Sequence, residues 1–174
     1  DMLASSFKAF SGSITGLIDS VDINEYKYRN ISLNGIFSEH TWDGSVKISE
    51  NNIKMDLLGM FDFRSKLPEF DFTLNLAEAD LYRLRLSKDT SAAVTMLLTA
   101  NFKGSNIDNL DGEIKLLNSN LTLKGNELEF YDFTLSTFFE DNEPAISLRT
   151  DYIDADIRRC NRSIIVNLRY IRRL

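Results

Sequence analysis

The length, composition and charge of this chain exclude several classes of protein. It has 174 residues, and 43% of them are hydrophobic, which is enough for the core of one ordinary domain. A single cysteine excludes a disulfide framework within the chain, and no run of apolar residues is long enough to predict a membrane-spanning helix. The formal net charge is −6, and an acidic surface repels nucleic-acid phosphates. We therefore expect no nucleic-acid partner.

The charge is unevenly distributed along the chain. Residues 158–174 contain six arginines and no acidic residue, so subtracting +6 from −6 leaves −12 for residues 1–157. Every second residue from Ile164 to Tyr170 is apolar, which is typical of an edge strand with a basic outer face. The abrupt change of composition would also fit non-native sequence. We therefore divide the chain into a β-repeat segment, 1–157, and a basic tail, 158–174, that is either an edge strand or non-native.

Apolar and polar residues alternate with a period of two along most of the chain, most clearly from Asn52 to Leu76. The odd positions from Ile53 to Phe63 are apolar, with Gly59 keeping the phase. After a turn at Leu67–Pro68, the even positions from Phe70 to Leu76 repeat the pattern. Because successive side chains of a strand point to opposite faces, this alternation predicts a sheet that buries one face only.

The same alternation predicts strands along the rest of the chain, separated by short polar or glycine-containing segments that include Trp42–Gly44. Met2–Phe10 is a candidate short helix, and we interpret 79–96 as a loop or short helical insert with Asp89 or Ser91 as a candidate N-cap. The predicted strands lie near residues 10–18, 24–38, 43–49, 52–64, 68–78, 94–104, 110–117, 119–124, 127–138, 145–150 and 152–157.

We therefore expect an all-β fold, an elongated curved sheet of about ten or eleven strands that forms a half-open hydrophobic groove. Glycines recur within the predicted strands, at Gly35, Gly59 and Gly104, and interior glycines are typical of bends or of close approach between backbones. The alternative is a closed β-sandwich, in which a second sheet covers the apolar face.

Candidates for catalysis or metal binding are few. His40 is the only histidine and lacks any supporting triad signature, and Cys160 has no base near it in sequence. Clustered acids such as Asp151, Asp154 and Asp156 lack the spacing of a calcium loop and are more typical of solvated turns and strand faces. We expect no enzymatic activity, no cofactor and no bound metal.

Several segments, taken in their order and spacing, resemble the repeating segments of the TamB (translocation and assembly module) family of the AsmA-like superfamily, most of all its Bacteroidota-type versions. Together they cover about residues 10 to 157. The segments are Tyr26–Phe37, Trp42–Ile48, Asn52–Asp62, Phe70–Phe72, Ala79–Leu81 and Ala100–Gly112.

The resemblance implies a long periplasmic protein, anchored in the inner membrane by a segment not present in this chain, whose strands stack into a trough with an apolar lining. Members of this family are linked to phospholipid traffic between the inner and outer membranes and, in some lineages, to outer-membrane protein assembly with a BamA-like partner. The chain resembles an internal fragment of such a protein. The expected partners are phospholipid acyl chains and, through regions outside this chain, a BamA-like protein.

The expected lipid-lining residues are the apolar members of the alternating pattern. They are Ile31, Leu33, Phe37, Ile53, Met55, Leu57, Phe61, Phe63, Phe70, Phe72, Leu74, Leu76, Leu98, Phe102, Ile114 and Leu116.

Overall fold

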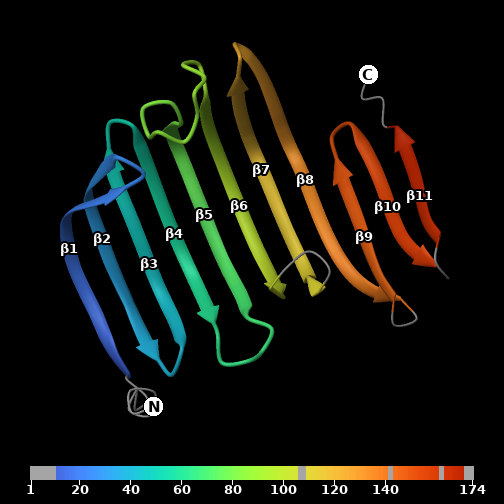
Figure 1. Cartoon of the computed structure of the whole chain (residues 1–174), viewed down its shortest axis with the longest axis horizontal. Coiled ribbons are helices and arrows are strands. Elements are labelled where there is room, and N and C mark those ends of the chain that lie inside the picture. The colour runs from blue at the N-terminus through green and yellow to red at the C-terminus, as the bar shows by residue number, and fades with distance from the viewer. Residues whose placement is uncertain (1–10, 106–108, 141–142, 161–162, 171–174) are drawn as a thin grey trace.

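A computed structural model describes residues 11–105, 109–140, 143–160 and 163–170. These residues form one antiparallel sheet whose eleven strands follow one another in chain order, in a single layer with β1 and β11 at its edges (Figure 1). The strands are β1 (Ser11–Ile23), β2 (Tyr26–Ser38), β3 (Thr41–Glu50), β4 (Ile53–Asp62), β5 (Glu69–Asp80), β6 (Ala93–Lys103), β7 (Asp111–Leu123), β8 (Asn126–Glu140), β9 (Glu143–Thr150), β10 (Ile153–Cys160) and β11 (Ser163–Tyr170).

The predicted all-β class and open sheet are confirmed. All eleven strands belong to the one sheet, so the closed-sandwich alternative is wrong for the described part of the chain. Whether the apolar face forms a groove stays a prediction. The basic residues after Ile157 do not end the sheet, because β11 pairs along its length with β10.

Two details of the sequence interpretation are corrected. The segments 110–117 and 119–124 are one strand, β7, in which Asn118 adopts a positive φ of 45° without ending the strand. Trp42 lies inside β3 and not in a turn, because the chain reverses at Glu39 and His40, both with positive φ. In both places a residue with a turn-like signal lies inside a strand, with a shift of register beside Asn118 and with regular pairing at Trp42.

The strand registers place the apolar positions on one face of the sheet, which we call the apolar face. One row of directly paired residues runs Leu33, Val46, Leu57, Leu74, Leu98, Leu116 across β2 to β7. A neighbouring row continues to the far edge through Ile114, Leu135, Leu148, Ala155 and Leu168.

The pairing is irregular in three neighbouring strand pairs, β4–β5, β5–β6 and β6–β7. The register shifts between Lys54 and Met55, between Leu76 and Ala79, and between Thr95 and Leu97. A bulge adds a residue to one strand and bends it. Leu76 and Ala79 are three residues apart, so a regular strand would point them to opposite faces, but both are buried. The bulge turns both toward the apolar face.

The segment between β5 and β6, residues 81–92, is a compact loop without an α-helix. Its ends pair through the hydrogen bond from Leu81 N to Ala92 O, at 2.9 Å, and Leu84 N donates to Asp80 O at 3.0 Å. The Asp89 carboxylate accepts from Ser91 N at 3.0 Å and from Lys124 N in the β7–β8 turn. Asp89 therefore ties the loop to the next hairpin and does not begin a helix. The other helix candidate, Met2–Phe10, lies outside the described residues.

A row of glycines brings neighbouring strands close together. Gly35, Gly44 and Gly59 are directly paired across β2, β3 and β4. A β-carbon on Gly44 would collide with Asn34 O and Gly35 Cα, and one on Gly35 would lie 2.7 Å from Trp42 Nε1. Because most of these obstacles are backbone atoms, a larger residue could be fitted only by moving a strand.

This close approach predicts that Gly44→Ala destabilises the fold by about 1–3 kcal/mol, the usual range for overpacking. Gly16→Ala is the matched control, because Gly16 is also in a strand and nothing lies within 4 Å of its added β-carbon. We expect the control to stay within about 0.5 kcal/mol of the parent chain. Chemical denaturation of the three proteins measures this, and equal losses in both variants would contradict the close-approach argument.

Candidate functional site

The apolar face is the main candidate site, because a single-layered sheet leaves much of it without protein cover. The chain exposes 12743 Å², whereas a compact monomer of its mass, 19.9 kDa, would expose about 8,700 Å². Among the described residues, Leu84 is the only large side chain with less than 2% of its surface exposed. An excess of this kind fits the single layer that the described residues form.

The sequence-predicted lining residues all fall on this face. The registers pair Phe61 with Phe70, Leu57 with Leu74 and Met55 with Leu76, so the two runs keep phase across the β4–β5 turn. Phe63 lies just past β4, is 55% exposed, and its ring is 5.7 Å from that of Phe70. Ile31, Ile53 and Leu76 are buried, whereas the remaining residues of the predicted set are partly exposed.

The sequence interpretation missed the contribution of β3. Trp42, Val46 and Ile48 lie between the predicted residues of β2 and β4 and complete the rows. Their spacing with Gly44 is an unbroken period of two, the signal that could have identified them. Counting Trp42 and Gly44 as turn residues hid it.

One end of the apolar face is covered by the chain itself. Ile31, Ile48, Ile53, Leu76, Ala79 and Leu84 form a buried group that we call the capped cluster. Leu84 comes from the β5–β6 loop and is 0% exposed, and the tip of the β1–β2 hairpin adds Tyr26 and Tyr28, whose rings are 4.8 Å apart. Burial is the main cause that raises the pKa of both tyrosines.

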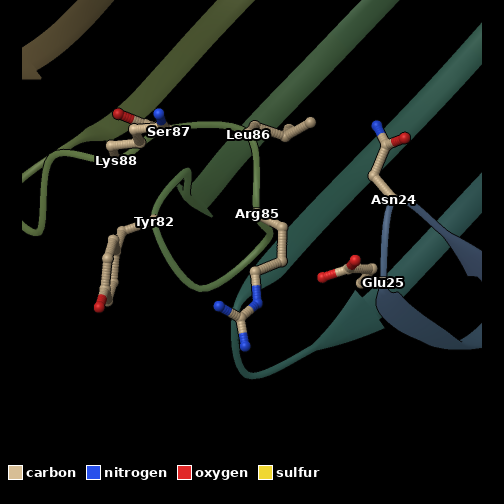
Figure 2. A pocket seen from close by; sticks show the side chains of 7 residues that line it. All are labelled: Asn24, Glu25, Tyr82, Arg85, Leu86, Ser87 and Lys88. Atoms are coloured by element: carbon tan, nitrogen blue, oxygen red, sulfur yellow. The ribbon is translucent and has the colours of Figure 1, made fainter.

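The loop and the hairpin tip meet at a cleft of about 590 Å³, shown in Figure 2. Asn24 and Glu25 come from the β1–β2 turn, and the Glu25 carboxylate points toward the Arg85 side chain of the loop (Figure 2). Its lining is mostly polar and its side chains are largely exposed. The cleft therefore marks the junction between the two parts of the cap and offers no enclosed site.

The other end of the strands carries a continuous row of aromatic rings. Phe37, Trp42, Phe61, Phe70 and Phe102 are directly paired across β2 to β6, and we call them the aromatic row. Successive ring centroids lie 6.5, 5.4, 5.8 and 4.7 Å apart. Phe72 adjoins the row and stacks on Phe61 at 5.4 Å. These distances are those of favourable ring contacts, so the rings form one connected surface.

Trp42 is positioned in this row by packing against Gly35 and not by a hydrogen bond from its ring. Its ring is buried, and its Nε1–H finds no acceptor among the described residues. The indole nitrogen lies instead over Gly35, where only a glycine leaves room for it. The row contains no other polar side-chain group, because its remaining members are phenylalanines.

The opposite face carries cross-strand ion pairs, together with a few exposed apolar side chains such as Ile36 and Leu58. Lys47 Nζ lies 3.0 Å from Asp56, Lys54 Nζ lies 2.5 Å from Glu78, and Lys103 Nζ lies 2.6 Å from Glu69. All six side chains are more than 40% exposed, so each pair contributes no more than about 1 kcal/mol. The charged side chains of these pairs favour contact of this face with water, whereas the aromatic row carries no charged group.

The weaker candidates from the sequence are not brought together. His40 is an exposed turn residue, and the side chain of Cys160 lies outside the described residues. Asp151 accepts hydrogen bonds from the backbone of Tyr131 and Asp132, while Arg149 Nη2 lies 2.8 Å from Asp156. In the described ranges no group of acidic, histidine or cysteine residues could hold a metal ion. No helix in those ranges is long and apolar enough to cross a membrane.

Comparison of the chain with known protein families, curated proteins and solved structures finds no match.

Removing the buried side chain of the cap tests how far the capped cluster stabilises the sheet. Leu84→Ala leaves a cavity, so we expect the free energy of unfolding to fall by about 2–5 kcal/mol. Leu86→Ala in the same loop is the matched control, because Leu86 is 55% exposed, and we expect a change within about 0.5 kcal/mol. Urea denaturation of both variants measures the difference, and a Leu84→Ala protein as stable as the control would show that the cap is not a core.

The ion pair at Asp62 predicts a pH dependence of stability. Hydrogen bonds from the Arg64 side chain and backbone lower the pKa of Asp62 from 3.8 to about 2. Because the pKa is lower in the folded state, this stabilisation is present above pH 3.8 and is lost as the pH falls toward 2. We expect Asp62→Asn to be less stable than the parent at pH 6 and to approach it near pH 2. A stability difference that stays constant across this range would refute the assignment.

Proposed function

We propose that this chain is a section of a bridge-like protein that carries phospholipid acyl chains along its apolar sheet face, between the inner and outer membranes of a cell envelope. The observation that carries the proposal is the series of apolar rows across the strands, over which the described residues place no second sheet and only the loop of the capped cluster. The resemblance of residues 10 to 157 to the TamB family supports the same function.

Acyl chains suit this face chemically. Burial of apolar surface is non-directional and needs no hydrogen-bonding partner. The side chains of the rows carry almost no hydrogen-bonding groups. Exposed apolar patches beyond a few hundred Å² mark interaction sites in soluble proteins. A lipid tail supplies the cover that a second sheet gives in a sandwich. A polar substrate would find no convergent donors or acceptors on the aromatic row.

The dimensions suit a conduit. The rows run across the strands, and eleven strands spaced by about 4.8 Å give a path of about 48 Å. The hydrocarbon core of a whole bilayer is about 30 Å thick, so one leaflet contributes about 15 Å. The path thus exceeds the length of one tail, and the chain would form a section of a longer route. We propose a periplasmic location, an inner-membrane anchor outside this chain and no enzymatic activity.

A scaffold or chaperone in outer-membrane protein assembly, with a BamA-like partner, is the second candidate. It is favoured by the edges of the sheet, because in the described part of the chain no strand pairs with the outer edge of β1 or β11. An unpaired edge can add a strand from another protein through backbone hydrogen bonds. This candidate uses the edges, whereas lipid transport uses the apolar face.

A charge on the apolar face separates lipid binding from folding. We expect Phe72→Arg to reduce phospholipid retained by the purified chain several-fold, because an acyl chain cannot solvate the charge. The partly exposed ring gives up about 1 kcal/mol of stacking with Phe61, whereas an unpaired charge in a closed core would cost about 3–5 kcal/mol. Thr73→Arg, one residue away on the polar face and exposed, is the matched control and should retain lipid.

Native mass spectrometry of the three proteins, purified without detergent and incubated with phosphatidylglycerol vesicles, measures bound lipid, and thermal unfolding measures stability. Loss of the fold in Phe72→Arg but not in Thr73→Arg would show that protein covers the face. A folded parent chain that binds no phospholipid would defeat the proposal and leave the scaffold role.

A further inference from the structure

We infer that the acyl chain on this section follows the aromatic row and does not enter the capped cluster. The inference rests on the proposed function and assigns the path within it. On the strands β2 to β6 the capped cluster lies toward one end and the aromatic row toward the other, and the row from Leu33 to Leu116 crosses between them. Ile31 of the capped cluster and Phe37 of the aromatic row are six residues apart on β2, which separates the cluster from the row by about 20 Å. The two lie at opposite ends of the same face, and within the described part of the chain the β5–β6 loop covers only the capped cluster.

The capped cluster is already covered by a side chain of the protein itself. Leu84 from the loop fills it and is 0% exposed, while Ile31, Ile48 and Ile53 beneath it are all buried. Hydrogen bonds fix that loop at several points. Ser91 Oγ accepts from Gly125 N at 2.9 Å, and Leu86 N and Ser87 N both donate to Leu81 O at 2.9 Å. A lipid tail would have to displace a packed leucine and break these bonds, gaining no apolar contact that the protein does not already make.

The aromatic row needs no such displacement. Phe37, Phe61, Phe70 and Phe102 are each partly exposed, and Phe63 beside them is 55% exposed. Their rings contact one another without a gap, so the surface is formed before any ligand arrives. A preformed surface loses little side-chain entropy on binding. A tail can therefore cover the aromatic row without displacing any side chain of the cap.

The length of the row fits one tail. Five strands contribute one ring each, and four intervals of about 4.8 Å give about 19 Å. A tail within one leaflet occupies about 15 Å. Beyond Phe102 the same row continues with Gly112 and Thr137, so the aromatic surface ends there. A single acyl chain lying across the strands is thus the ligand whose length suits the row.

The test maps where a tail lies on the unaltered chain. The full chain is incubated with vesicles of phosphatidylcholine that carries a photoactivatable diazirine in one acyl chain, irradiated, and analysed by peptide mass spectrometry. We expect adducts on the aromatic row and Phe72 at least ten times more often than on Ile31, Ile48, Ile53 or Leu84. Adducts at similar frequency on the capped cluster would overturn the inference and leave the proposed function standing. No adduct on either row would defeat both.

A pair of variants tests whether the cap is what excludes the tail. In Leu84→Ala, if it remains folded by circular dichroism, we expect new adducts on Ile48 and Ile53, because the cavity is apolar. In Leu86→Ala, whose side chain is exposed on the same loop, the adduct pattern should match the parent. Absence of new adducts in a folded Leu84→Ala chain would show that the loop does not control access and would overturn the inference. For an unfolded variant, the adduct map of the parent chain decides alone.

Discussion

The structure depends on the unbroken backbone pairing of eleven strands in chain order. Each strand pairs with the one before it, and directly paired residues point to the same face of the sheet. The apolar positions of successive strands therefore gather on one face. Every strand but the two at the edges has both of its edges satisfied by neighbours. Because the meander uses all its strands in one layer, hydrogen bonding is complete within the sheet while apolar burial is not. That imbalance defines the candidate site.

The capped cluster shows how the chain behaves where it does bury this face. It combines a bulge that turns Leu76 and Ala79 to one side, a hairpin tip that brings Tyr26, and a loop that inserts Leu84. Together these supply a local core for a sheet that otherwise has little. Exposed ion pairs on the other face contribute too little to replace it. The cap therefore stabilises the middle strands and leaves the rest of the face available.

The sequence predicted the fold class and most of the apolar face, because period-two alternation depends only on local residue order. It assigned Trp42 to a turn because Asp43 and Gly44 follow it, although Trp42 keeps the period of two with Gly44 and Val46. It also divided β7 at Asn118, whose positive φ is absorbed by a bulge. The sequence pattern could not predict the burial of Leu84, because contacts between a loop and distant strands leave no periodic signal.

The contrast between the two ends of the strands argues for an external cover. The sequence places a leucine where the chain covers itself and a series of phenylalanines where it does not, although both rows cross the same strands. A second sheet would have to lie about 10 Å above this one, and all the strands of the described residues already belong to this one. Rings that contact one another and stay partly exposed are therefore best explained as a surface completed by something from outside. A flexible hydrocarbon can follow such a row without matching any polar group.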